Sequence, residues 1–243
     1  DEGWTGADGI YSLPMTGEER HGTYHQTSTA FVFSDTFIGR VDPALLARRG
    51  NHMVNNTLAI LVVVYGNREF EDALLELKNL AIALGFNPVA GGAFIGEHSF
   101  ATADVPIANG RPDELDVQKA LDFGVRIREK IAAFPSTGDY ADLRVPGAFP
   151  YEAAGARPME VSPVTLEDAC TVCGTCASVC PTEAITADDT VKTQVERCMR
   201  CCACIKACPS GARVIENSQW KYIATWLNEN CSDRKDPQFF GID

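Results

Sequence analysis

Eight of the ten cysteines lie in two copies of one spacing, and their thiolates could bind metal. Each copy reads C-x2-C-x2-C-x3-C-P, and the second follows the first at an offset of twenty-eight residues. Thiolate sulfur is a ligand for structural zinc and for iron-sulfur clusters. The copies are Cys170, Cys173, Cys176, Cys180 with Pro181, and Cys198, Cys201, Cys204, Cys208 with Pro209.

This spacing favours two [4Fe-4S] clusters, because it is the general signature of two-cluster bacterial ferredoxins. Three cysteines two residues apart can form a tight loop around one iron-sulfur cube, and the fourth ligand must come from elsewhere. Cys176 and Cys180 are four residues apart, so on one helical turn they share a face about 6 Å apart along the axis. The prediction is a crossed assignment, with Cys170, Cys173, Cys176 and Cys208 on one cluster and Cys198, Cys201, Cys204 and Cys180 on the other.

Two other uses of these cysteines are less well supported. A structural zinc site needs four ligands and has no use for a third and fourth cysteine at these positions in duplicate. A disulfide framework would not leave the first 169 residues without a cysteine. Cys202 and Cys231 fall outside the pattern and are expected to be small buried hydrophobic residues or incidental thiols, although Cys202 could touch the cluster surroundings.

The elements that must position the cysteines also repeat. Pro181 and Pro209 are expected to end two short helices. Ala184 and Ala212 occupy the same offset, and each precedes a short apolar or β-branched stretch. The segment therefore predicts a duplicated α+β unit.

The N-terminal part predicts an α/β domain with a doubly wound parallel sheet. Residues 30–33 and 59–65 are continuous apolar runs typical of strands buried on both faces, and residues 86–95 form a third strand. Helices are expected over residues 69–84, ending at Gly85, and over residues 113–134, beginning after Pro112. In the second helix the expected inward positions are Val117, Ala120, Leu121, Gly124, Ile127 and Ile131.

The loops at the carboxyl ends of these strands are the expected ligand site of such a sheet. His98 lies in one of them and could relay protons, but a hydrogen-bonded loop residue is the commoner role. No Ser-His-Asp or Cys-His constellation is visible, so the sequence predicts no catalytic residues.

The stretches VVVYGNREFEDALLELKN, GAFIGEHSF and GRPDELD, with the two cysteine motifs, resemble the flavodoxin-ferredoxin fusion proteins of anaerobic bacteria over about residues 28 to 243. This resemblance implies a flavodoxin-like sheet that binds FMN and exchanges electrons with a ferredoxin domain. An aromatic such as Phe37 or Tyr65 could stack on the flavin, although the glycines of these loops could equally serve only as turns. The flavin residues that the resemblance implies are Thr36, Phe37, Ile38, Gly39, Arg40, Tyr65, Gly66, Asn67 and Arg68.

One part of the flavodoxin pattern is missing. A flavodoxin opens with an apolar strand and a loop that wraps the FMN phosphate, but residues 1–10 are polar and rich in glycine. In the strand order 2-1-3-4-5 that strand would be central. Since the chain also begins at Asp1 rather than Met, either upstream residues are absent or this region is remodelled and FMN binding is lost.

We expect four regions along the chain. They are a flavodoxin-like domain over 1–134, a semi-rigid linker rich in proline and glycine over 135–165, a dicluster ferredoxin domain over 166–217, and a C-terminal helix with an irregular tail over 218–243. The helix is expected over residues 218–230, with Trp220, Ile223, Trp226 and Leu227 at helical spacing.

Composition narrows the function classes. The net charge of -12 argues against nucleic-acid binding and fits docking to basic patches on redox partner proteins, although it could serve solubility alone. No run is long and apolar enough to span a membrane, and we expect a reducing, anaerobic cytoplasm. The sequence thus predicts an electron carrier. The alternatives are a flavin-dependent reductase fed by the clusters, or an α/β domain that only docks a partner enzyme.

Overall fold

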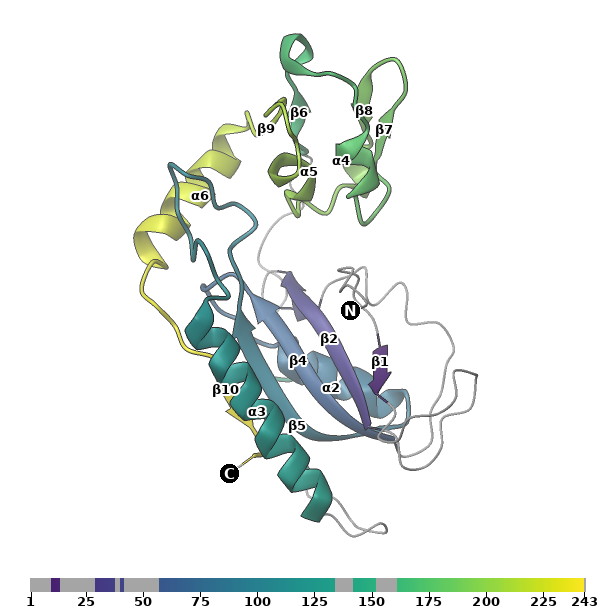
Figure 1. Cartoon of the computed structure of the whole chain (residues 1–243), viewed down its shortest axis with the longest axis vertical. Helices are drawn as coiled ribbons and strands as arrows, with labels where there is room; N and C mark the ends of the chain where they lie inside the picture. The colour runs from purple at the N-terminus through teal and green to yellow at the C-terminus, as the bar shows by residue number, and fades with distance from the viewer. Residues whose placement is uncertain are drawn as a thin grey trace. The chain divides into compact units, whose positions relative to one another are not determined.

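The computed structural model separates by its contacts into two units, which are described one at a time (Figure 1). The sheet unit comprises the described residues of Asp1–Gly96, Gly110–Gly155 and Arg234–Asp243, and the cluster unit those of Glu97–Asn109 and Ala156–Asp233. The predicted boundaries did not anticipate that residues 97–109 group with the cysteines or that residues 234–243 group with the sheet. The structure describes residues 10–13, 29–37, 40–41, 57–133, 142–151 and 161–242.

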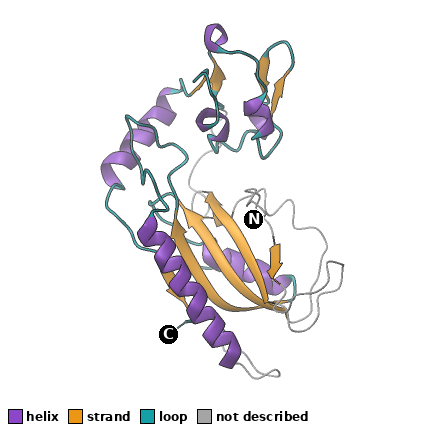
Figure 2. Cartoon of the chain, in the orientation of Figure 1, coloured by secondary structure: helices purple, strands orange, loops and turns teal. Residues whose placement is uncertain are grey.

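The sheet unit is built on three parallel strands with antiparallel strands at both edges (Figure 2). β4 (Thr57–Tyr65) pairs in parallel with β2 (Thr29–Phe37) and with β5 (Phe86–Ile95). The remaining strands are β1 (Ile10–Leu13), antiparallel to β2, β3 (Arg40–Val41), also antiparallel to β2, and β10 (Gln238–Phe240), antiparallel to β5.

The sheet is therefore mixed: the predicted parallel pairing is confirmed for β2, β4 and β5, whereas the antiparallel strands were not predicted. The flavodoxin order requires a parallel strand beside β2, but that position is taken by the short antiparallel β1. The tail, expected to be irregular, returns to the sheet as β10 and fills the open edge of β5. An unpaired edge strand exposes N–H and C=O groups, so pairing the tail with β5 satisfies groups that would otherwise need water.

Helices cover both faces of the parallel strands, as a doubly wound sheet requires. A Cβ built on Gly91 would meet Leu74 of α2 (Ala73–Ala83) at 3.5 Å, and one built on Gly92 would meet Phe123 of α3 (Glu114–Ala133) at 3.2 Å. Successive residues of a strand point to opposite faces, so α2 and α3 lie on opposite sides of β5. Figure 1 shows α3 in front of the sheet and α2 behind it.

The two helices match their predicted positions, but α3 is rotated from its predicted face. Val117 and Leu121, expected to be inward, are 50% and 60% exposed; Ile127 is buried as predicted, and Phe123, which was not predicted, is buried as well. Phe123 stacks on Phe239 with ring centroids 4.7 Å apart. The large aromatic area that these rings bury decides which side of the helix faces the sheet.

Residues 142–151 of the expected linker pack against α2 and its N-terminal end. Lys78 pairs with Asp142 at 2.7 Å, the Asp72 carboxylate accepts from the Ala148 amide at 2.8 Å, and the Asn79 amide donates to the Tyr151 hydroxyl at 2.7 Å. Lys78 and Asn79 lie in α2, and Asp72 immediately precedes it. Residues 142–151 therefore belong to the sheet unit.

The cluster unit repeats its elements at the offset of the cysteine motifs. In each half, a strand leads to a 3-10 turn, a one-turn helix and a second strand. The first strand of each half pairs with the second strand of the other half, β6 with β9 and β8 with β7. The bounds are β6 Val164–Thr165, η1 Glu167–Ala169, α4 Thr175–Ser178, β7 Ile185–Ala187, β8 Val191–Thr193, η2 Val195–Arg197, α5 Ala203–Lys206 and β9 Arg213–Val214.

The C-terminal helix α6 (Ser218–Asn230) has the predicted bounds and packs on the segment 97–109. Trp220 is fully buried against Phe100, with ring centroids 4.9 Å apart. Leu227 is buried with Ala101 and Ile107. None of the described helices, α6 included, combines the length and apolar composition needed to cross a membrane.

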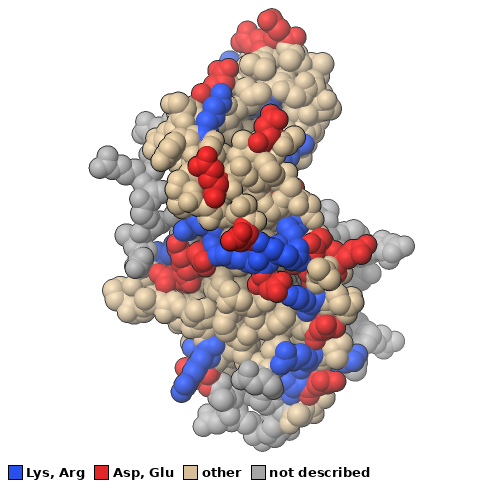
Figure 3. Space-filling model, turned by 90° about the vertical axis from the view of Figure 1, so that its left-hand side faces the viewer, with Lys and Arg blue, Asp and Glu red and all other residues tan. Residues whose placement is uncertain are grey.

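Charged side chains are interspersed on the face of the molecule drawn in Figure 3. Arg234 pairs with Asp113 at 2.5 Å, and Lys119 pairs with Asp236 at 2.7 Å. Both pairs connect the segment leading to β10 with the beginning of α3. These ion pairs therefore connect the segment before β10 to the beginning of α3.

Candidate functional site

The backbone around the cysteines adopts the same turns in both halves. Three pairs of residues related by the offset of twenty-eight all have positive φ angles, a region that residues other than glycine rarely occupy. This match shows that the halves bend identically where the thiols must converge. The pairs are Val172 (52°) with Arg200 (61°), Gly174 (77°) with Cys202 (60°), and Glu183 (51°) with Gly211 (65°).

Two equivalent backbone hydrogen bonds join each half of the unit to the other half. The Leu166 amide donates to the Ala212 carbonyl at 2.8 Å, and the Gln194 amide donates to the Ala184 carbonyl at 2.8 Å. Each bond joins the turn before one motif to the third residue after the proline that follows the other motif. These bonds place the last cysteine of each motif near the beginning of the other motif.

The first group of thiols surrounds a small hollow in the cluster unit. Its lining brings Cys208 of the second motif together with Cys170, Cys173 and Cys176 of the first. The Val172 amide donates to the Cys170 sulfur at 3.5 Å. Cys176 is buried on α4, and this burial raises the pKa of its thiol, whereas Cys173 is exposed. We call this group site one.

The second group is buried more deeply and contains Cys180 of the first motif. Burial is the main reason that the pKa of Cys201 is raised, and repulsion from the neighbouring thiols of Cys204, Cys180 and Cys198 adds to it. Burial also raises the pKa of Cys204, again with Cys198 and Cys180 as charged neighbours. We call these four residues site two.

Hydrogen-bond donors surround the sulfurs. The Ala184 amide donates to the Cys180 sulfur at 3.2 Å, and hydroxyls lie at equivalent positions beside the two motif-ending cysteines. These are Thr182, 3.7 Å from the Cys180 sulfur, and Ser210, 3.7 Å from the Cys208 sulfur. Such bonds favour the thiolate form, and the Thr175 hydroxyl, 3.3 Å from the Cys173 sulfur, is the main reason that the pKa of Cys173 is lowered.

The donor set fits a pair of [4Fe-4S] clusters. All ten cysteine thiols are free, so disulfide bonding is not what holds this unit together. Each site offers four thiols, one for each iron of a cube. Arg213 lines site one, and its Nε–H is buried without a hydrogen-bond partner among the described residues. A buried cation beside thiolates is compatible with a negatively charged cluster, which would partly balance its charge.

The same residues offer less support for a zinc site. Within the described part of the chain, no three His, Cys, Asp or Glu side chains are arranged to hold a single metal ion. Zinc draws four ligands to one point, whereas a four-iron cube binds each thiolate at a different corner. The thiols of site one are instead spread around a hollow.

The two cysteines outside the motifs have packing roles. Cys202 is 2% exposed and lies beside site two, where burial strongly raises the pKa of its thiol. Cys231 packs against the cluster of Ala101, Ile107 and Leu227 at the end of α6. Both positions match the expectation of small buried or partly buried residues.

Several of the predicted flavin residues contact other residues of the sheet unit. Tyr65 is 3% exposed and lies against Phe70, and the Asn67 side chain is 1% exposed and accepts from the Lys235 amide at 3.4 Å. Arg40 forms a two-pronged pair with Glu76 of α2. Arg68 pairs with Glu71 at 2.7 Å, and Gly66 is partly buried. Thr36 and Phe37 end β2, and Ile38 and Gly39 lie outside the described residues.

The segment before β10 lies against the loop that follows β4. Besides its bond to Asn67, Lys235 donates from its ammonium group to the Arg68 carbonyl and pairs with Glu69. The C-terminal chain therefore contacts this part of the carboxyl edge. Flavin binding at these residues stays a prediction.

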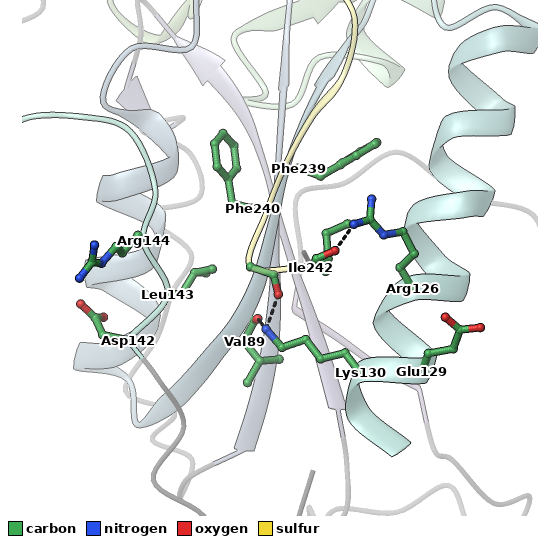
Figure 4. A pocket seen from close by; sticks show the side chains of 11 residues that line it. Val89, Arg126, Glu129, Lys130, Asp142, Leu143, Arg144, Phe239, Phe240 and Ile242 are labelled. Carbon is green, nitrogen blue, oxygen red and sulfur yellow. Dashed lines mark hydrogen bonds between the residues drawn. The ribbon is translucent and has the colours of Figure 1, made fainter. Parts of the chain in front are cut away.

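A cavity in the sheet unit lies elsewhere (Figure 4). Its volume of about 690 Å³ is in the range of small-molecule pockets. Two of its three basic residues, however, bind the protein's own backbone: Lys130 donates to the Val89 carbonyl at 2.9 Å and to the Gly241 carbonyl, and Arg126 donates to the Ile242 carbonyl. None of the described predicted flavin residues lines this cavity.

His98 is held within the cluster unit. Its Nδ1 accepts from the Phe100 amide at 3.0 Å, and its ring packs edge-on against Phe100. Lys206 of α5 donates to the His98 carbonyl at 3.1 Å. This matches the expectation of a hydrogen-bonded loop residue.

Two functional features were missed by the sequence analysis. The segment 97–109 reaches α5 through Lys206, and no local pattern indicates that contact. The sequence also did not lead us to expect Arg213 near both sites. A signal for it was present, because Arg213 stands at the offset where the first half has Ile185, a buried apolar residue.

Comparison with known proteins identifies the cluster unit. Residues 162–209 match the family model described as a 4Fe-4S dicluster domain. The match covers both cysteine motifs, and this part of the chain is therefore a domain of the kind that holds two [4Fe-4S] clusters. No curated protein matches the chain.

Proposed function

We propose that this chain transfers electrons through two [4Fe-4S] clusters held by the crossed sets of cysteines. The observation that carries the proposal is the grouping of thiols from both motifs around each site. Cys208 lines site one with the first three cysteines of the first motif, and Cys180 is a charged neighbour of Cys201 and Cys204 in site two. The match to a dicluster domain supports the same function.

When bound, each cluster would supply a group that accepts and releases one electron at a potential set by its surroundings. The chain provides those surroundings. Cys170, Cys173, Cys176 and Cys208 would hold the first cluster, and Cys198, Cys201, Cys204 and Cys180 the second. Ala184 and Val172 direct backbone N–H groups at ligand sulfurs. Cys173 is exposed and Cys204 is buried, so site one would be the more accessible to a redox partner protein.

The proposal is tested on the chain purified without oxygen. We expect about eight irons and about eight acid-labile sulfides per chain, with a broad absorption that bleaches on chemical reduction. About four irons would mean that only one site is occupied. A colourless protein that contains zinc instead of iron would contradict the proposal.

The flavin-dependent reductase remains a second hypothesis that rests on the sequence resemblance. The helices on both faces of the parallel strands are compatible with it, whereas the antiparallel β1 and the buried Tyr65 do not favour it. Acid release of flavin from the same iron-containing sample separates the hypotheses. About one FMN per chain would support the reductase, and its absence in a sample with full iron would leave the sheet unit as a docking module.

A further inference from the structure

Arg213 begins β9 and is 3% exposed. In the first half of the duplicated unit the corresponding residue is Ile185, which begins β7 and packs with Cys176 and Cys204. Burying an arginine is costly unless its charge and its N–H groups are satisfied. The second half thus has a cation at the position where the first half has an apolar core residue.

The guanidinium of Arg213 is held between the two halves. It donates to the Thr165 hydroxyl at 2.6 Å, to the Thr193 hydroxyl at 2.9 Å and to the Pro163 carbonyl at 3.0 Å. Thr165 and Thr193 are themselves related by the offset of twenty-eight residues. The Arg213 side chain thus binds equivalent hydroxyls from both copies of the repeat. These bonds fix its guanidinium near the centre of the unit.

The same guanidinium faces thiols of both sites. It donates to the Cys204 sulfur of site two at 3.9 Å, and Arg213 lines the hollow of site one. The partners in its hydrogen bonds are two hydroxyls, a carbonyl and a thiol. Among the described residues no carboxylate forms an ion pair with Arg213, so thiolates and the group they bind would balance this buried cation.

We propose that Arg213 is a positioning residue that raises the reduction potentials of both clusters, and that of the cluster at site two more strongly. This inference rests on the proposed function. Each one-electron reduction adds negative charge to a cluster that is already negative, and a fixed cation in a buried setting favours the more negative state. The direct hydrogen bond to Cys204 makes the effect larger at site two, so the two sites are unequal although their backbones match.

The test is a redox titration of the full chain followed by electron paramagnetic resonance. The variants are Arg213→Gln, which removes the charge, and Arg213→Ile, which restores the residue of the first half. We expect both to keep about eight irons. The more affected cluster should show at least a tenfold fall in its equilibrium constant for reduction, which corresponds to about 59 mV for one electron. The other midpoint should fall less.

Lys192→Gln is the matched control, because Lys192 is an exposed cation on β8 of the same unit. We expect its midpoints to equal those of the unaltered chain, since water screens an exposed charge. Unchanged midpoints in an iron-replete Arg213 variant would overturn the inference. Coincident midpoints in the unaltered chain would also overturn it, whether or not the variants assemble. Absence of iron from the unaltered chain would instead contradict the proposed function.

Discussion

Cys202 stands at the backbone position of Gly174 in the repeat, with a φ angle of 60° where Gly174 has 77°. Both residues immediately precede a one-turn helix that carries the third cysteine of a motif. The turn requires a left-handed conformation, which glycine adopts without steric cost. Cys202 thus occupies a backbone position that favours glycine.

This relationship predicts how Cys202 responds to substitution. Cys202→Gly should keep about eight irons and change the free energy of unfolding by no more than about 1 kcal/mol, since relief of the backbone offsets the loss of a small buried side chain. Cys202→Val should lower stability by about 1–3 kcal/mol, because a β-branched residue resists positive φ. Iron analysis and denaturant unfolding under argon measure both effects. Loss of a cluster in Cys202→Gly would show that this thiol is a ligand.

The crossed ligation predicts a pattern among double variants. Cys170→Ser with Cys208→Ser removes two ligands of the same cluster and should leave about four irons per chain. Cys198→Ser with Cys208→Ser removes one ligand from each cluster and should leave fewer. Iron analysis with magnetic resonance of the reduced protein measures the outcome. The opposite ranking would show that each motif closes its own cluster.

The burial of Trp220 against Phe100 predicts that this side chain stabilises the packing of α6 on the segment 97–109. Trp220→Ala should destabilise this packing by about 3–5 kcal/mol, because the side chain is fully buried and a cavity would remain. Trp220→Phe should cost less, because a ring remains against Phe100 and the indole N–H has no partner among the described residues. Hydrogen exchange over α6 and residues 97–109 measures the change. Equal protection in Trp220→Ala and the unaltered chain would contradict the prediction.

The contact between Arg111 and Asp116 predicts a loss of stability in acid. Arg111 donates to both carboxylate oxygens of Asp116 in a buried setting, and this bond is the main reason that the pKa of Asp116 is lowered. A lowered folded pKa stabilises the protein above the unfolded value of about 3.9, and the contribution is lost as the pH falls through the folded pKa. Protection of α3 and β10 from hydrogen exchange should therefore fall below about pH 4.

Asp116→Asn is the control for this effect. It removes the carboxylate that binds the buried Arg111 and leaves Asp113, 3.9 Å from the Arg111 Nε, as a weaker partner, so it should cost up to about 3–5 kcal/mol near neutral pH. Its acid dependence should be shallower than that of the unaltered chain, because asparagine does not titrate. An unchanged slope would assign the acid sensitivity to other carboxylates, among them Asp113.

Much of the cluster unit follows from short-range features of the sequence. The cysteine spacing indicates thiols grouped within a few residues, and such local geometry depends on turns and single helical turns that neighbouring residues define. The bounds of α6 follow from Asn217, which accepts from the Trp220 amide at 3.0 Å as a helix cap, and from the apolar spacing after it. The continuous apolar run of β4 likewise indicates a strand buried on both faces.

Other features depend on partners that are distant in the chain. Phe123 turns α3 away from its predicted face because Phe239, from the tail, stacks on it. β10 forms only because the edge of β5 is available to it, and a three-residue strand has no local pattern strong enough to indicate this pairing. Arg213 lies between the sites because hydroxyls from both halves meet there. The sequence by itself determined which residues can bind clusters, since ligand chemistry and spacing are local, whereas the tertiary structure decided which charges and strands surround them, because burial and pairing arise only when distant segments meet.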